Sequence, residues 1–288
     1  MKLQHRDGTI TEQKDSLEKP LSFLYGNAFG RLLLKPLTAR WVSLLAGSFL
    51  STSLSKGFIK SFIRKNGIDM SQFEDVPYRS YNEFFSRKIR PEVRPIDMEP
   101  HHLISPCDCK LTALPIADDS IFTLKHTPYT VSSLLKNEEL AQRFRGGTAL
   151  IFRLCVEDYH RYCYIADGEK TEQTRIPGKF HTVNPIANDH FPIYKENTRE
   201  YCLLRTDAFG EILVMEVGAL LVGRIVNHHE AASVRRGQEK GYFQFGGSTI
   251  VVLLPPNAAA IDPDILEASQ KGLETVVRYG EKIGISTK

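Results

Sequence analysis

Two adjacent glycines and a serine interrupt an apolar segment near the end of the chain, "GYFQFGGSTIVVLLP" at residues 241–255. Glycine weakens the interior of a strand, so this pair indicates a place where a side chain would obstruct the backbone. The residue that follows the glycines, Ser248, carries a hydroxyl that a neighbouring base can deprotonate. Its oxygen could then attack the carbonyl of Gly247, because a glycine leaves that carbonyl accessible. The pattern therefore predicts cleavage of the chain between Gly247 and Ser248.

Such a cleavage would leave a reactive group on the protein itself. Elimination from the ester releases the upstream chain and leaves dehydroalanine, which hydrolyses to an N-terminal pyruvoyl group. The base that starts the reaction would be a histidine oriented by a carboxylate, as in a protease triad. Asp108 in "SPCDCK" and His160 in "VEDYHRYC" are candidates for these two roles. The sequence thus predicts a protein that makes its own electrophilic cofactor from Ser248.

Two more common chemistries fit the spacing less well. Four residues have side chains suited to zinc: Cys107, Cys109, His160 and Cys163. A C-x-C pair with a distant H-x-x-C is not a standard structural zinc spacing, and the sequence has no H-E-x-x-H motif. Ser248 lacks the G-x-S-x-G elbow of the α/β hydrolases and stands at the start of a predicted strand. We therefore expect no metal site and no conventional serine hydrolase.

The elements that must position these residues change in character about a third of the way along the chain. The first part indicates helices, including a short one with Ser80 as N-cap that runs to Phe85. The second part has the periodicity of strands separated by turn residues, followed by a predicted closing helix at residues 262–284. Helices followed by strands indicate an α+β protein. We expect a helical region at residues 1–100 and a largely antiparallel, β-rich domain at residues 101–288.

The helical region is basic as well as apolar. It has no acidic residue between Glu18 and Asp69, and eight cations lie in that interval: Lys19, Arg31, Lys35, Arg40, Lys56, Lys60, Arg64 and Lys65. These alternate with apolar and aromatic residues such as Trp41 and Phe49, as in helices that lie on an anionic membrane surface. Residues 41–55, the longest uncharged stretch, are too few and too rich in serine for a spanning helix. The alternative is a helical layer packed on the rest of the protein.

Composition further narrows the classes of protein to which the chain could belong. A net charge of +3 gives no indication of nucleic-acid binding. The first twenty residues are polar and contain no apolar signal segment, so we expect the protein on the cytoplasmic side. An odd number of cysteines, five, in a chain of this length is typical of reduced thiols rather than of a disulfide framework.

Several stretches, in this order, resemble the phosphatidylserine decarboxylase proenzymes, a pyruvoyl-dependent family: "YRSYNEFFSRKIRPEVRPID", "ISPCDCKL", "DYHRY", "GKFHTVNPIA", "ENTREY", "VGALLVGRI" and "RGQEKGYFQFGGSTIVVLL". Together they extend over roughly residues 78–254, and the last is the most specific. The resemblance implies that Ser248 becomes the pyruvoyl group. It also implies cleavage into a β chain of residues 1–247 and an α chain of residues 248–288, which stay associated.

The family's other functional residues match less evenly. Its catalytic aspartate matches Asp108, although the usual glycine after it is Cys109 here. Its histidine segment has two histidines three residues apart, and the second is usually the base for self-cleavage. Here the first matches His160 and the second position is Cys163. The base therefore stays open: His160 serves in both processing and decarboxylation, maturation is impaired, or another histidine takes part, namely His181, His228 or His229.

The resemblance also implies an enzymatic activity and a location in the cell. The enzyme would convert phosphatidylserine to phosphatidylethanolamine and carbon dioxide through a Schiff base to the pyruvoyl group, which has the role that pyridoxal phosphate has elsewhere. It would act as a peripheral protein on the cytoplasmic face of the cell membrane, with an anionic membrane surface as its partner, and a homodimer is compatible with this. Two alternatives remain: a pyruvoyl-dependent decarboxylase of a soluble amino acid, and a non-catalytic lipid-binding relative.

Overall fold

A large, mostly antiparallel sheet organises the molecule. The computed structural model describes residues 2–12, 18–117, 119–124, 127–179, 181–182, 191–219, 224–244 and 248–288. The sheet has eleven strands, with β10 (Thr174–Ile176) paired to β11 off the main path. In spatial order the others are β14 (Ala232–Val234), β9 (Gly168–Lys170), β11 (Arg199–Thr206), β12 (Gly210–Val217), β16 (Ser248–Leu254), β7 (Thr148–Leu154), β4 (Cys109–Pro115), β18 (Glu274–Val277), β1 (Lys2–Gln4) and β2 (Ile10–Glu12).

The strand β16 lies at the centre of this sheet. It pairs along its whole length with β7, from Ser248 opposite Leu154 to Leu254 opposite Thr148, and with β12 on its other side. All seven of its residues are buried. A strand covered on both faces reads as a continuous apolar run, which explains why "IVVLL" lacks the alternation of a half-exposed strand.

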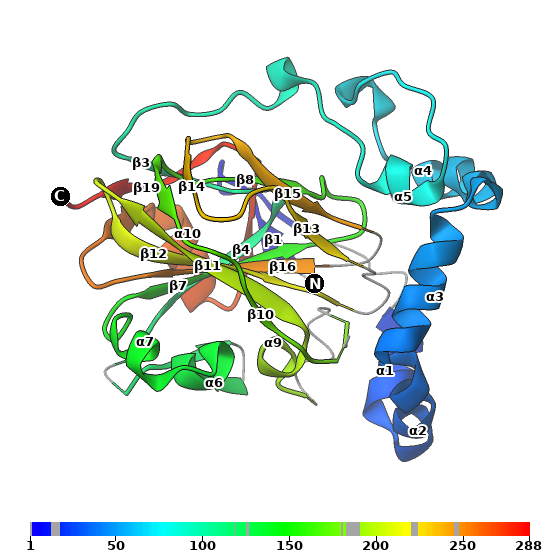
Figure 1. Cartoon of the computed structure of the whole chain (residues 1–288), viewed down its shortest axis with the longest axis horizontal. Helices are drawn as coiled ribbons and strands as arrows, with labels where there is room; N and C mark the ends of the chain where they lie inside the picture. The colour runs from blue at the N-terminus through cyan, green and yellow to red at the C-terminus, as the bar shows by residue number, and fades with distance from the viewer. Residues whose placement is uncertain are drawn as a thin grey trace.

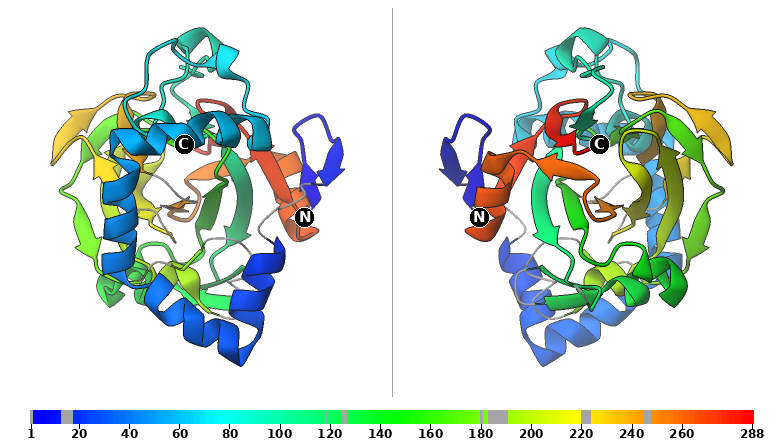
Figure 2. Two further views of the ribbon diagram at one scale, coloured as in Figure 1. Left: turned by 90° about the vertical axis from the view of Figure 1, so that its right-hand side faces the viewer. Right: turned by 90° about the vertical axis from the view of Figure 1, so that its left-hand side faces the viewer.

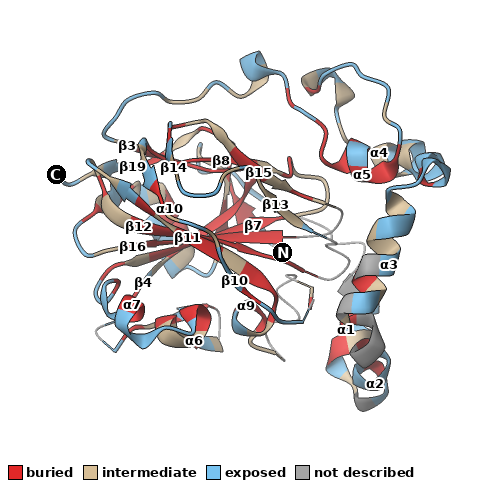
Figure 3. Ribbon diagram, viewed as in Figure 1, coloured by how far each residue is buried: buried red, intermediate tan, exposed pale blue. Residues whose placement is uncertain are grey.

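Smaller elements lie on the two faces of the large sheet. A three-stranded sheet of β13 (Ile225–Asn227), β15 (Glu239–Phe243) and β8 (Arg161–Cys163) lies above it in Figure 1. The helices α6 (Val131–Leu135), α7 (Glu138–Gln142) and α9 (Ile193–Glu196) lie below it. The remaining strands form β17 (Ala259–Ile261), β19 (Lys282–Ser286) and β3 (His102–Ile104) in one sheet, and the hairpin of β5 (Ile121–Leu124) and β6 (Thr127–Thr130). Figure 3 shows that the buried residues concentrate in the central strands of the large sheet, such as β16, β7 and β12.

The N-terminal helices form an arm along one side of the strands (Figures 1 and 2). They are α1 (Glu18–Gly26), α2 (Ala28–Leu37), α3 (Arg40–Leu50) and α4 (Ile59–Asn66), with a 3-10 turn at Ser53–Phe58 before α4 and further 3-10 turns at Met70–Gln72 and Pro91–Val93. Within the described residues, no single helix has the length and apolar character to cross a bilayer. The segments Trp41–Leu50 and Ser53–Asn66, bent by 79°, meet both criteria only as a pair.

The short helix α5 (Tyr81–Phe85) confirms one expectation in detail. The side chain of Ser80 accepts a hydrogen bond from the backbone N–H of Glu83, which satisfies a donor that the helix start would leave unpaired. Phe84 and Phe85 are fully buried, and Phe62 of α4 packs edge-on against Phe84. The helix therefore anchors the arm to the rest of the protein.

The α+β class is confirmed, but two segments differ from expectation. Residues 2–12 form the hairpin β1–β2, which lies beside the C-terminal strands because β1 pairs in parallel with β18 (Figure 2). The predicted helix at residues 262–284 is wrong beyond its first half, since α10 (Pro263–Gln270) is followed by β18 and β19. Gly272 ends α10 with φ of +71°, a conformation that favours glycine.

Candidate active site

Ser248 is buried and is the first residue of β16. It therefore lies at the edge of the sheet that is formed by the ends of the strands, where β16 begins. Its side chain is fully buried, and its Oγ has no hydrogen-bond partner among the described residues. A buried hydroxyl without a partner costs about 1–3 kcal/mol, so its presence needs an explanation, of which a catalytic role is one. Gly247, and with it the predicted scissile bond, lies outside the described residues.

The register of the central strands brings Asp108 to the same edge. Ser248 pairs with Leu154 at the end of β7, and the preceding residue, Arg153, pairs with Lys110 in β4. Cys109 at the start of β4 is thus level with Ser248 across two strand spacings, about 10 Å. Asp108 directly precedes it. The predicted catalytic aspartate and the predicted scissile serine therefore share one edge of the sheet.

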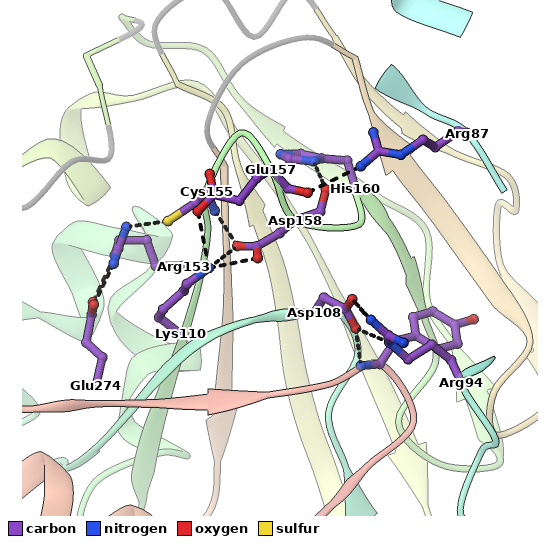
Figure 4. Close-up of polar contacts among 11 residues, drawn as sticks. Arg87, Arg94, Asp108, Lys110, Arg153, Cys155, Glu157, Asp158, His160 and Glu274 are labelled. Atoms are coloured by element: carbon purple, nitrogen blue, oxygen red, sulfur yellow. Dashed lines mark hydrogen bonds and ion pairs between the residues drawn. The ribbon is translucent and has the colours of Figure 1, made fainter. Parts of the chain in front are cut away.

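The partners of Asp108 are an arginine and a backbone amide. Arg94 donates to both carboxylate oxygens, with Nη2 at 2.7 Å from Oδ2 and Nε at 2.9 Å from Oδ1 (Figure 4). The N–H of Tyr279 donates to Oδ1 at 2.8 Å. No histidine is among the partners of Asp108 in the described part of the chain. Its carboxylate is thus fixed by Arg94, and the catalytic role of Asp108 stays a prediction.

His160 precedes β8 and is fully buried. Its Nδ1 lies 2.9 Å from the carbonyl oxygen of Asp158, so Nδ1 carries the proton and Nε2 carries the lone pair of the neutral ring. The ring lies 4.1 Å from that of Phe85, centroid to centroid. The carbonyl of His160 accepts a hydrogen bond from Phe243 at the end of β15, the strand that leads toward Ser248. His160 is thus held in one orientation beside the segment that enters the site.

A buried group of charges fixes the loop that carries His160 (Figure 4). Lys110 Nζ lies 2.7 Å from each carboxylate oxygen of Asp158, and the same carboxylate accepts from the N–H of Cys155 at 2.7 Å. Burial is the largest single influence on the pKa of Lys110 and would lower it, but the attraction of Asp158, together with that of Cys155 and Glu157, outweighs burial and raises the pKa. Next to this pair, Arg153 forms a two-pronged ion pair with Glu274. Lys110 therefore stays charged and pins Asp158, whose carbonyl orients His160.

The other histidines differ in their distance from this edge. His181 is buried beside Tyr25 of α1, and both its backbone N–H and its carbonyl bond to the side chain of Asn197. Asn197 also donates to the carbonyl of Gly218, which directly follows the pair formed by Val217 and Thr249. His181 is therefore near the edge where β16 begins.

His228 and His229 lie at the far end of β13. The end of β13 nearest the site is Ile225, which pairs with Phe243, and the two histidines follow its opposite end. His228 Nε2 pairs with Glu239 at 2.7 Å, and His229 Nδ1 lies 3.2 Å from the hydroxyl of Tyr164. Their positions make His160 and His181 the better placed histidines.

The chain is similar to proteins of one known family over most of its length. The sequence model described as phosphatidylserine decarboxylase matches residues 81–285. A protein of Clostridium acetobutylicum named phosphatidylserine decarboxylase proenzyme 2 is 46% identical over 276 residues, which cover 96% of this chain and 94% of that protein. The chain belongs to the phosphatidylserine decarboxylase family.

Two further relatives carry the name phosphatidylserine decarboxylase proenzyme. The one from Ruminiclostridium cellulolyticum is 40% identical over 92% of this chain and 90% of its own length. The one from Fusobacterium nucleatum is 38% identical over 98% of this chain and 96% of its own length. The family expected from the sequence is therefore confirmed, and Ser248, Asp108 and His160 all lie within the matched residues.

The cysteine at the second histidine position of the family motif is not suited to act as a base. Cys163 is fully buried, and burial raises the pKa of its thiol to about 12. A thiol with that pKa stays protonated at neutral pH and cannot accept a proton from Ser248. All five cysteines are free thiols. Cys163 therefore does not supply the base that the resemblance places at this position, which leaves the other expectations: His160 or another histidine is the base, or maturation is impaired.

Three residues that hold the predicted site together were not predicted from the sequence: Arg94, Lys110 and Tyr279. Arg94 lies in "RPEVRPID", one of the stretches that resemble the family, and Lys110 lies two residues after Asp108. A buried cation needs a buried anion, so a lysine inside an apolar strand was the available signal for Lys110. Tyr279 contributes its backbone amide, which any residue type could provide, so the sequence offers no signal for it.

Proposed function

We propose that this protein is a self-cleaving, pyruvoyl-dependent enzyme that converts phosphatidylserine to phosphatidylethanolamine and carbon dioxide at a membrane surface. The observation that carries the proposal is the Ser248 hydroxyl, which is fully buried and lacks a partner among the described residues at the start of β16. The two glycines before it and the names of the relatives support the same conclusion.

Self-cleavage requires only groups of this chain and water. A base, for which we favour His160 because it matches the family's motif, takes the proton of Ser248 Oγ, and the oxygen attacks the carbonyl carbon of Gly247. The C–N bond breaks as its nitrogen takes up a proton, which leaves an ester. Removal of the Cα proton of residue 248 then breaks the bond between its Cβ and Oγ, so that Gly247 leaves as a carboxylate that keeps Oγ and residue 248 becomes dehydroalanine. Water finally replaces the nitrogen at residue 248, and ammonia leaves.

The two chains would stay together because the new N-terminus lies inside the sheet. Residues 248–288 contribute β16, which lies between β12 and β7, and β18, which lies between β4 and β1. A pyruvoyl group at residue 248 supplies a ketone that accepts the substrate amine and the electrons released as carbon dioxide leaves. Its position fits that role, because the start of β16 is held by strands on both sides. His160 then donates the proton that the substrate carbon needs.

The helical arm supports action at a membrane. Nine large apolar side chains on and just after α1–α3 are between 43% and 79% exposed: Phe23, Phe29, Leu32, Leu33, Trp41, Leu45, Phe49, Leu54 and Phe58. Five exposed cations accompany them: Arg31, Lys56, Lys60, Arg64 and Lys65. Exposed apolar groups among cations suit an anionic leaflet, to which each cation near the surface contributes about 1 kcal/mol. We place the protein on the cytoplasmic face of the cell membrane as a peripheral enzyme.

One set of measurements tests the proposal. Intact-mass spectrometry of the purified protein should show two chains, one of which starts with a pyruvoyl group at residue 248. The Ser248→Ala variant should stay full length and inactive. Carbon dioxide release should be seen with phosphatidylserine vesicles and not with free amino acids. A single full-length species in the wild type would leave the non-catalytic lipid-binding alternative, and release from free serine alone would favour the soluble substrate.

A further inference from the structure

A polar pocket lies between the two facing sheets, apart from the residues proposed to act on Ser248. Its volume is about 270 Å³, and residues of both sheets line it. Its charged and polar lining includes Arg175, Thr198, Glu200, Arg224, Asn227 and Glu230. A volume near the lower limit of ligand pockets suits a small polar group rather than an acyl chain.

The pocket lies on the face of the large sheet to which the side chain of Ser248 also points. Side chains alternate along a strand, so Ser248 and Ile250 point to the same face. Ile250 is paired with Glu216, and Glu216 is paired with Glu200 of the pocket. Cross-strand partners share a face. The side chains of Ser248 and Glu200 therefore project into the same space between the sheets.

The pocket is also close to the edge where β16 begins. Thr198 accepts a backbone hydrogen bond from Gly218, and Gly218 is level with Ser248 because Val217 pairs with Thr249. Thr198 is thus two strand spacings, about 10 Å, from Ser248. On the opposite wall, the carbonyl of Arg224 accepts from Gln244, in the segment that leads to Ser248. Both walls therefore reach the edge at which the substrate amine must arrive.

Most charges in and under the pocket are already balanced. Glu200 lies 3.7 Å from Arg175 and accepts a hydrogen bond from Asn227. Beneath them, the fully buried Glu216 pairs with Lys240 at 2.7 Å. These interactions hold the two sheets together, and the residues that make them carry no net charge.

Two charged groups of the pocket remain unpaired among the described residues, and they lie at opposite ends of β13. Arg224, an exposed residue, directly precedes the strand on the side of Ser248, and its guanidinium has no hydrogen bond or ion pair with the described residues. Glu230 follows the other end of the strand. The end of the pocket nearest Ser248 therefore presents an uncompensated cation.

We propose that this pocket binds the phosphodiester group of the phosphatidylserine headgroup, with Arg224 as its cation. The inference rests on the proposed function, because it takes the substrate amine to residue 248. Four bonds of ~1.5 Å separate that amine from phosphorus, so the phosphate lies about 5 Å beyond it. A guanidinium donor adds about 3 Å. The sum, about 8 Å, is comparable with the two strand spacings, about 10 Å, between Ser248 and Thr198 of the pocket. Arg224 would thus favour phosphatidylserine over free serine, which has no phosphate.

The first test compares Arg224→Gln with Arg205→Gln, a variant of an exposed arginine on β11 that pairs with Glu211 instead. Self-cleavage should be normal in both, because no substrate takes part in it. With phosphatidylserine in mixed micelles, Arg224→Gln should raise KM at least tenfold and change kcat less than threefold, and Arg205→Gln should match the wild type. A KM for Arg224→Gln within twofold of the wild type would overturn the proposal.

The second test needs no decarboxylation and so separates this inference from the proposed function. The uncleaved Ser248→Ala protein should bind glycerophosphoserine, measured by NMR titration, at least tenfold more tightly than L-serine. Adding Arg224→Gln should abolish that preference, whereas adding Arg205→Gln should keep it. Equal binding with and without Arg224, or no binding of glycerophosphoserine to Ser248→Ala, contradicts the pocket assignment. An uncleaved, inactive wild type would instead contradict the proposed function.

Discussion

The carbonyl oxygen of His160 accepts a hydrogen bond of 2.9 Å from the backbone N–H of Phe243. This bond joins the start of β8 to the end of β15, and the chain then runs from Phe243 toward Ser248. The position of His160 relative to the entering segment is therefore set by the sheet itself and not by a flexible side chain. Its Nδ1 is committed to the carbonyl of Asp158, which leaves Nε2 as the basic atom.

His160→Ala should slow self-cleavage by at least ~100-fold, the usual contribution of a positioned general base. The measurement is the fraction of full-length chain over time after synthesis, followed by intact mass. His228→Ala is the matched control, because His228 lies at the far end of β13, and it should cleave normally. Normal cleavage in His160→Ala would move the base to another histidine, of which His181 is the next best placed. Cys163→Ala should also cleave normally, because burial raises the pKa of Cys163 to about 12 and keeps its thiol protonated.

Lys110→Met should both destabilise the protein and slow cleavage. It leaves the Asp158 carboxylate buried without its cation, and breaking such a pair costs about 3–5 kcal/mol. The free energy of unfolding, measured by urea titration of the Ser248→Ala protein, should fall by that order. Asp158→Asn and the double variant complete the cycle. We expect the double variant to be more stable than Lys110→Met alone, since neither charge then remains unpaired. A double variant whose loss equals the sum of the two single losses would show that the pair is not coupled.

The part of the site that the sequence predicts best is the part that depends on local chemistry. Gly247 and Ser248 stand out because glycines are unusual inside an apolar strand, and the structure places Ser248 at the start of such a strand. The partnership of Arg94 with Asp108 was not predictable, because it depends on how the loop before β3 crosses the sheet edge. A pattern in one segment carries no information about which distant residue will face it.

The C-terminal segment shows the same limit for the fold. Residues after α10 have the composition of a helix in part, yet Glu274–Val277 forms β18 because β4 and β1 provide partners on both sides. β1 comes from the other end of the chain and pairs with β18 in parallel. Tertiary pairing between the two ends overrides local preference, which a reading of either end alone does not reveal.

His181 should make stability fall as the pH is lowered. Burial is the main cause that lowers its pKa below the usual value near 6.5. The unfolded chain therefore takes up a proton near pH 6.5 that the folded protein does not. Below that pH the free energy of unfolding falls, by at most about 1.4 kcal/mol per pH unit. Unfolding of the Ser248→Ala protein in urea at pH 7.5 and 5.5 measures the loss. His181→Gln should reduce it and His228→Gln should not. An unchanged loss in His181→Gln would assign the pH dependence to other groups.

The helical arm should bind anionic vesicles through both its apolar and its basic side chains. Trp41 and Phe49 are 59% and 46% exposed on α3. Burying such a side chain contributes about 1.5–3 kcal/mol, so Trp41→Ala with Phe49→Ala should weaken vesicle binding at least tenfold in a sedimentation assay. Met98→Ala, an equally exposed apolar residue outside the arm, is the control. Binding to phosphatidylglycerol vesicles should also fall with added salt, since the cations act through screened attraction. Salt-independent binding that is equal in both variants would place the contact on another surface and leave α3 as a packing element.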